Sequence, residues 1–181
     1  MHVSVRKLCR WGRYWLRRVF RWQLRDRPRR MRPRGREPDP TFAPSELLYM
    51  RVRRCHVEGA RLTDVSAIRF PDQSVNRSKY SKASDVLIPD PNHERSSRWI
   101  HLGVLGFPVE AVPACLTTNG HVVCDLRVEH DPLERNYAHS EIRAYRDGTR
   151  IREKKGIGRA HRKRYRLAIM EEARVVIDPL E

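Results

Sequence analysis

The stretch ACLTTNGHVVCDLRVEH, residues 114–130, decides the fold class of this chain. Asn119 and Gly120 form a favoured two-residue turn of a β-hairpin, because both central positions of such a turn need a positive φ. The residues after the turn alternate between two faces, as they do in a half-buried strand. One face is expected to carry Val122, Cys124, Leu126, Val128 and His130. The stretch therefore predicts a hairpin and, with it, an antiparallel sheet.

Further strands are predicted on both sides of this hairpin. A second two-residue turn is expected at Asp147-Gly148, between HSEIRAY and TRIRE. Partial alternation and apolar residues favour more strands, at 48–57, 66–70, 85–88 and 98–105. Residues 71–85 are polar and are expected to form a loop between two of these strands.

The C-terminal segment 158–177 has the apolar spacing of an amphipathic helix. Its buried side is expected to hold Tyr165, Ala168, Ile169, Ala173 and Val176. A helix of this kind covers one face of a sheet. The sequence therefore predicts an α+β fold, an antiparallel sheet of about five to seven strands with the C-terminal helix packed on it.

The net charge of the 181-residue chain is +16 and is unevenly distributed. Residues 1–37 hold 14 Lys/Arg and two acids, a charge of +12. Residues 38–149 have a charge of −1, and residues 150–181 have a charge of +5. A neutral body with two basic ends indicates a polyanionic partner: nucleic acid, an anionic membrane surface or an acidic protein.

Residues 1–25 are predicted to form a basic amphipathic helix. At helical spacing, one stripe holds Leu8, Trp11, Trp15, Val19 and Trp22, and the opposite arc holds Arg6, Arg10, Arg13, Arg17, Arg21 and Arg25. Four roles stay open for this helix. It docks on the body or on a protein partner, lies at an anionic membrane surface, places arginines along phosphates, or acts as an organellar targeting segment.

Residues 26–44 contain five prolines, one glycine and a charge run, which are typical of a linker. The predicted organisation is therefore a helix at 1–25, a Pro/Arg-rich linker at 26–44 and an α+β domain at 45–181.

Cysteine spacing and hydropathy indicate a cytoplasmic, or at least intracellular, protein. Cys9, Cys55, Cys115 and Cys124 form no Cys-x-x-Cys pair, so reduced thiols are expected, although Cys115 and Cys124 could face each other across the hairpin. The sequence has no run of about 18 apolar residues, so no transmembrane segment is expected.

A second stretch, EHDPLERNYAHSEIRAY at 129–145, concentrates groups that carry chemistry. The candidate catalytic residues are His130, Asn136, His139 and Glu141. If the two strands pair, both histidines lie at the same end of the sheet. Three roles stay open for the two imidazoles. They bind a divalent metal, they act as general acid and base on a phosphodiester, or they only hydrogen-bond the loop between the strands.

Strand alternation separates these candidates. His139, Glu141, Arg143 and Tyr145 fall on a polar face, whose residues should be replaceable at little cost in stability, whereas His130 ends an apolar stripe. Known motifs are incomplete here. His139-x-Glu141 lacks the Pro-Cys-x-x-Cys half of zinc deaminases, and the chain has no phosphate-binding P-loop and no dinucleotide fingerprint.

Two other segments are predicted to bind phosphate. In the loop at 71–85, Arg77 and Lys79 offer cations among hydroxyl and amide groups. KKGIGRAHRKRYR, residues 154–166, holds seven Lys/Arg and no acid, and its glycines precede a helix start. Backbone amides and cations at a helix start favour an anion. The candidate residues there are Lys154, Lys155, Arg159 and Arg162.

These observations favour a protein that binds nucleic acid, RNA or single strands in particular, because no recognition-helix or zinc-finger pattern is present. Phosphodiester cleavage by a His/Glu site, as in a nuclease, is a subordinate hypothesis. The alternative is a non-enzymatic interaction module, whose N-terminal Trp/Arg helix docks to a protein partner or an anionic membrane surface.

Overall fold

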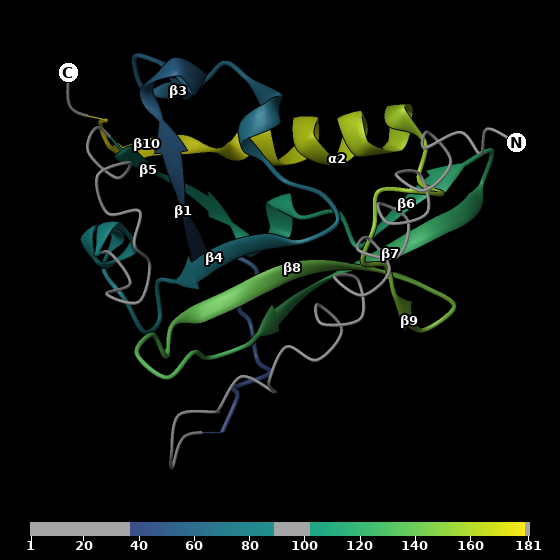
Figure 1. The fold of residues 1–181 in the computed structure, drawn as a ribbon, viewed down its shortest axis with the longest axis horizontal. Helices are drawn as coiled ribbons and strands as arrows, with labels where there is room; N and C mark the ends of the chain where they lie inside the picture. The colour runs from purple at the N-terminus through teal and green to yellow at the C-terminus, as the bar shows by residue number, and fades with distance from the viewer. Residues whose placement is uncertain (1–36, 89–101, 180–181) are drawn as a thin grey trace, which may run out of the picture.

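The computed structural model describes residues 37–88 and 102–179 (Figure 1). The predicted N-terminal helix at 1–25, most of the predicted linker and the start of the predicted strand at 98–105 lie outside these residues. Among the described helices, none is long and apolar enough to cross a membrane.

The described residues form a mostly antiparallel sheet with one α-helix near the C-terminus, which confirms a broadly α+β fold. The main sheet has eight strands: β1 (Leu47–Arg53), β4 (Gln73–Arg77), β5 (Leu102–Pro108), β6 (Cys115–Thr118), β7 (His121–His130), β8 (His139–Arg146), β9 (Thr149–Arg150) and β10 (Arg174–Ile177). Their order is β10-β5-β1-β4-β8-β7-β6, and β9 pairs with β8. A small second sheet pairs β2 (Val57–Glu58) with β3 (Arg61–Leu62).

The helix α2 (Arg159–Glu172) runs along the sheet from beside β6 to beside β10 (Figure 1). Tyr165 and Ile169 are its fully buried residues, as the helical spacing predicted. They join a core whose largest members from the strands are Leu48, Met50, Leu105, Phe107, Leu116 and Ile142. Burial raises the pKa of the Tyr165 phenol, as expected for a hydroxyl closed to water.

Both predicted hairpin turns are confirmed. Asn119 and Gly120 have φ values of 49° and 79°, and Asp147 and Gly148 have 50° and 73°. The turns join Thr118 to His121 in one hairpin and Arg146 to Thr149 in the other. Cys115 pairs with Asp125 rather than with Cys124, and both thiols are free.

Four local predictions are wrong, and three of them concern short elements. The predicted strand at 66–70 is replaced by a 3₁₀ turn, η2 (Val65–Ala67), and that at 85–88 by η3 (Ala83–Leu87). The end of the predicted helix is strand β10, in which Val176 is 48% exposed. The sequence of residues Arg174–Ile177 is compatible with a strand as well as with a helix. Antiparallel pairing with β5 favours the strand.

The most informative difference is β4, which lies inside the segment predicted to be a polar loop. It pairs with β1 on one side and β8 on the other, and four of its five residues are buried. The sequence of this strand resembles a connecting loop because it contains the polar residues Gln73, Asn76 and Arg77. Their polar groups are instead paired inside the protein, which is what allows them to be buried.

Candidate functional site

His130 and His139 lie on opposite faces of the sheet. In the register of β7 and β8, His130 stands opposite Ser140. His139 precedes Ser140, and successive strand residues point to opposite faces. The two imidazoles therefore do not converge on one reacting group, and the hypothesis of a His130–His139 acid–base pair is corrected.

Both ring nitrogens of His130 form hydrogen bonds with other residues of the protein. Its Nδ1 accepts a hydrogen bond from the backbone N–H of Asp39 at 2.8 Å, and its Nε2 donates to the carbonyl of Tyr137 at 2.5 Å. The ring stacks on Tyr80 with centroids 5.4 Å apart. Both ring nitrogens are thus used and the side chain is buried, which makes His130 a structural residue.

The opposite face carries an acid–arginine cluster, composed of Glu129, Asp131, Glu141 and Arg143. The Nη1 of Arg143 lies 2.6 Å from Glu129 Oε2, its Nη2 lies 2.7 Å from Glu141 Oε2, and Nη2 also contacts Asp131. Burial by itself lowers the pKa of Arg143, but hydrogen bonds to Glu129 and Glu141 outweigh it and raise the pKa above its ordinary value. The positive charge of Arg143 is therefore shared by three carboxylates.

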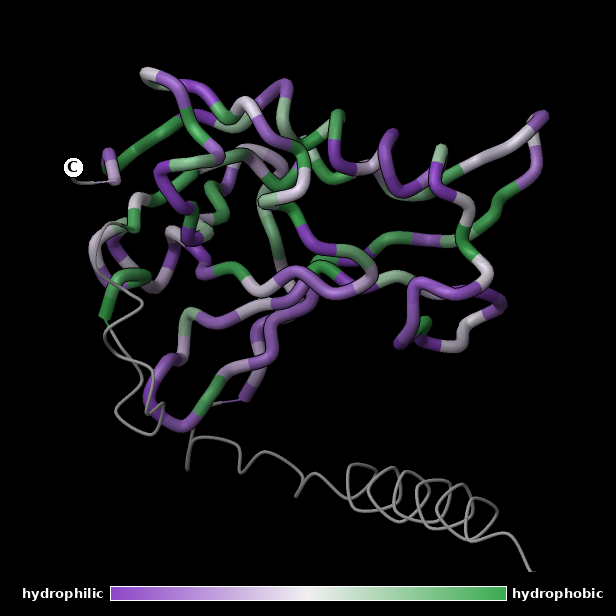
Figure 2. The backbone as a smooth tube through the Cα atoms, turned by 45° about the horizontal axis from the view of Figure 1, so that its top comes forward, coloured by the Kyte–Doolittle hydropathy of each residue, from purple (hydrophilic) through white to green (hydrophobic). Residues whose placement is uncertain are grey.

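The other predicted catalytic residues lie on the same face as this cluster. Asn136 donates from Nδ2 to Asn76 Oδ1 at 2.9 Å, and Asn76 stands opposite His139 in the sheet. His139 donates from Nδ1 to the carbonyl of Asp131 at 2.7 Å. Strand alternation predicted the shared face of His139 and Glu141, and the hydrogen bond to Asn76 brings Asn136 beside them. Figure 2 shows that the connection between β7 and β8 beside them is mostly hydrophilic.

These residues are nevertheless not the exposed polar surface that the sequence predicted. His139 is 6% exposed and Glu141 is 8% exposed. Glu141 also accepts from Arg150 Nη2 at 3.1 Å, so two arginines hold its carboxylate. Within residues 37–88 and 102–179, no three His, Cys, Asp or Glu side chains are arranged to hold a metal ion. The cluster is therefore a partly buried ion network, with Glu141 and Arg143 on its buried side.

Arg77 is the last residue of β4, Lys79 follows it closely, and both are engaged within the protein. Arg77 is fully buried and its guanidinium donates to both carboxylate oxygens of Glu46, at 2.7 and 2.9 Å. It also donates to the carbonyls of Asp39 (2.9 Å) and Thr41 and lies 3.8 Å from the centre of the Phe42 ring. With its donors used inside the protein, Arg77 is not placed to hold phosphate, and this site assignment is corrected.

Residues 37–44, which the sequence assigned to the linker, form an N-terminal strap that is fastened to the domain. Asp39 Oδ2 accepts from Lys79 Nζ at 2.8 Å and from the Tyr80 hydroxyl at 2.6 Å. The Lys79 hydrogen bond is the main reason that the pKa of Asp39 lies well below its usual range. Lys79 is thus paired with the strap, and the folded unit begins before residue 45.

The basic segment at residues 154–166 is arranged differently. It forms a turn, with Gly156 at φ 91°, and then the first two turns of α2. Lys154, Lys155 and Arg159 are exposed and Arg162 is partly exposed. Their side chains make no ion pair or hydrogen bond with another described residue, and the same holds for Lys163. These are the predicted phosphate-binding residues whose charge is presented to solvent.

The order of charges along α2 is opposite to the order that favours an isolated helix. Its residues 159–166 include Arg159, Arg162, Lys163, Arg164 and Arg166, and its last turn holds Glu171 and Glu172. The helix dipole favours anions at the N-terminus and cations at the C-terminus, typically by about 0.3–1 kcal/mol each. The first turn contains no acid, and Gly158 at the N-cap offers no side-chain acceptor. This end of the helix is therefore strongly electropositive.

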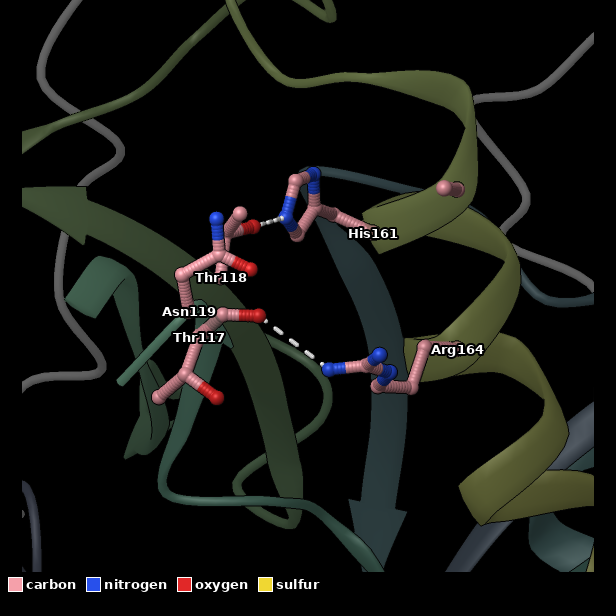
Figure 3. A pocket seen from close by; sticks show the side chains of 6 residues that line it. Thr117, Thr118, Asn119, His161 and Arg164 are labelled. Carbon is pink, nitrogen blue, oxygen red and sulfur yellow. Dashed lines mark hydrogen bonds between the residues drawn. The ribbon is translucent and has the colours of Figure 1, made fainter. Parts of the chain in front are cut away.

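A groove that the sequence did not indicate lies beside this end of α2 (Figure 3). It has a volume of about 340 Å³ and is lined by Thr117, Thr118, Asn119, Ala160, His161 and Arg164. The Asn119-Gly120 hairpin supplies one wall and α2 supplies the other. Arg164 Nη1 donates to the Thr117 carbonyl at 3.1 Å, and His161 Nε2 contacts the hydroxyl of Thr118.

Comparison of the chain with protein-family models, with curated proteins and with solved structures found no match.

Proposed function

We propose that this protein binds nucleic acid, and single strands of RNA in particular, through the basic segment at residues 154–166. The observation that carries the proposal is a contrast between two groups of cations. Arg77, Lys79, Arg143 and Arg150 are paired with carboxylates of the domain. Lys154, Lys155, Arg159, Arg162 and Lys163 have no such partner among the described residues and leave a concentrated positive surface.

The spacing of these cations favours a polymer of phosphates over a single anion. Lys154 and Lys155 lie in the turn, whereas Arg159 and Lys163 follow one another at i and i+4 on the exposed side of α2. A surface of this kind gains affinity by releasing the counterions of several neighbouring phosphates. A flexible single strand can follow the bend from turn to helix, which a stiff duplex does less readily.

The proposal is one of binding rather than cleavage. A phosphodiesterase needs an acid and a base within reach of the same phosphate. His130 and His139 are separated by the sheet, and Glu141 is held by two arginines. The +12 charge of residues 1–37 adds to the attraction for the same ligand.

The proposal is tested by fluorescence anisotropy with a labelled single-stranded RNA at about 0.1 M salt. Each phosphate contact on a single strand changes log K by about 0.7 for each tenfold change in salt concentration, so one contact adds about 0.7 log units of affinity at 0.1 M salt relative to 1 M salt. The variant K154Q/K155Q/R159Q should therefore bind at least about tenfold more weakly than the parent.

The matched control is R53Q/R61Q/R135Q, which removes the same charge from exposed positions outside the segment. This control should bind within about twofold to threefold of the parent. Equal losses in the two variants would show that net charge alone, and not the basic segment, attracts the RNA. Absence of binding by the parent would refute the proposal.

A further inference from the structure

The groove between the Asn119-Gly120 turn and α2 shares Ala160, His161 and Arg164 with the basic segment (Figure 3). The solvent-facing cations of the segment present charge alone, whereas the groove combines a cation with hydroxyl and amide groups. Its six lining residues include no Phe, Tyr or Trp and only one aliphatic side chain, that of Ala160. A second hollow, of about 320 Å³, is lined by Leu62, Leu167, Met170 and Ala173 together with three charged residues, and it has no hydroxyl or amide side chain.

We propose that this groove holds the ribose and phosphate of one nucleotide and so makes the protein select RNA over DNA. The inference rests on the proposed function, since the basic segment brings the strand to the groove. A volume of about 340 Å³ lies near the lower end of the range for ligand sites, about 300–1,000 Å³. This size suits one sugar–phosphate unit of a strand.

Arg164 supplies the phosphate contact. It reaches from α2 toward the hairpin, where Nη1 donates to the Thr117 carbonyl at 3.1 Å (Figure 3). One hydrogen bond fixes the guanidinium, and its Nε and Nη2 have no partner among the described residues. A guanidinium held in this way presents its remaining N–H groups in a fixed fork, which suits phosphate oxygens.

Thr118 supplies the contact that distinguishes a ribose. Its hydroxyl contacts His161 Nε2 across the groove, so that strand and helix fix each other's side chains. A hydroxyl has one donor and two acceptor positions, so Thr118 retains capacity for a further hydrogen bond. The 2′-hydroxyl, both donor and acceptor, is the group that separates RNA from DNA at such a site.

Gly158 allows His161 to occupy this place. A Cβ atom at residue 158 would lie 3.1 Å from His161 Nδ1, which is tighter than an ordinary contact. The imidazole is therefore seated closely on the start of α2, with Nδ1 closed to solvent. This seating aims Nε2 at Thr118 and keeps the groove in shape before any ligand binds.

The test compares the full chain on uridine and deoxyuridine oligonucleotides of equal length. The parent should bind the RNA about tenfold more tightly, the ratio that one further hydrogen bond of about 1.4 kcal/mol provides. T118V should bring this ratio close to one, whereas T118S, which keeps the hydroxyl, should preserve it. R164Q should weaken binding to both oligonucleotides.

The controls are T149V in the other hairpin and R135Q on an exposed loop, which should leave both affinities within about twofold of the parent. A parent that binds both oligonucleotides equally would overturn the inference while leaving the proposed function intact. The same holds if T118V and T149V give the same ratio, or if T118S behaves like T118V. A parent that binds neither oligonucleotide would overturn both proposals.

Discussion

Arg77 of β4 and Glu46 form a two-pronged ion pair, with two N–H groups donating to the two carboxylate oxygens at 2.7 and 2.9 Å. The same guanidinium donates to backbone carbonyls of the N-terminal strap. One buried side chain therefore joins a central strand of the sheet to the segment through which the basic N-terminus enters the domain.

Loss of either partner of this pair should destabilise the domain severely. E46Q and R77M each leave a buried polar group without its counterpart, which typically costs about 3–5 kcal/mol in the free energy of unfolding. Urea titration followed by circular dichroism measures this cost. The exposed Arg61 is the control, since R61Q should change stability by no more than about 0.5 kcal/mol. A similar small change for E46Q would mean that the pair is not buried in solution.

Truncation should locate the start of the folded unit before residue 45. Deletion of residues 1–44 removes the Asp39 N–H that His130 accepts and the carbonyls that Arg77 uses. Deletion of residues 1–36 keeps all of these groups. The longer deletion should therefore melt at a clearly lower temperature than the shorter one in calorimetry. Equal melting temperatures would show that the strap contributes nothing to the fold.

The pKa of Asp39 makes the strap sensitive to acid. Its folded pKa lies below the unfolded value of about 3.9, chiefly because Lys79 donates to the carboxylate. The sign follows directly: the stabilisation is present above about pH 4 and is lost as the pH falls through the folded pKa. Carboxyl NMR should find Asp39 still ionised at pH 3 in the parent.

K79M should raise the pKa of Asp39, since it removes the hydrogen bond that lowers this pKa most. The difference in melting temperature between the parent and D39N should shrink as the pH is lowered from 5 to 2.5. A carboxyl that titrates at its ordinary pKa in the parent would contradict this account of the strap.

His130 and His139 should both prove to be structural. H130A leaves the Asp39 N–H and the Tyr137 carbonyl without their partner, and H139A does the same to the Asp131 carbonyl. An unsatisfied buried group costs about 1–3 kcal/mol. H130A should therefore lower the melting temperature more than H139A, while RNA affinity measured on the folded fraction stays unchanged. A tenfold loss of RNA affinity in a fully folded H139A would return this histidine to the binding site.

Local sequence could predict the features whose causes are local. The two hairpins depend on positive φ at Asn119 and Asp147, and the apolar side of α2 depends on helical spacing. The strand alternation that separates His130 from His139 was equally readable. The solvent-facing cations at 154–163 could be recognised as well, because among the described residues they have no distant partner that would neutralise them.

What could not be predicted depends on partners far along the chain. β4 looks like a loop because the carboxylate that neutralises Arg77 belongs to Glu46, 31 residues away. The hydrogen bond that occupies His130 comes from Asp39, 91 residues away. The two walls of the groove meet through Thr118 and His161, 43 residues apart. In each case, the role of a polar residue is set by tertiary pairing rather than by its neighbours.

The central claim, that the solvent-facing cations of residues 154–166 neutralise phosphates, is tested most directly by the salt dependence of RNA binding. Each phosphate contact on a single strand contributes about −0.7 to the slope of log K against log salt concentration. The slope for K154Q/K155Q/R159Q should be less steep than that of the parent by about 2, while R53Q/R61Q/R135Q keeps the parent's slope. Identical slopes for the parent and K154Q/K155Q/R159Q would contradict the account.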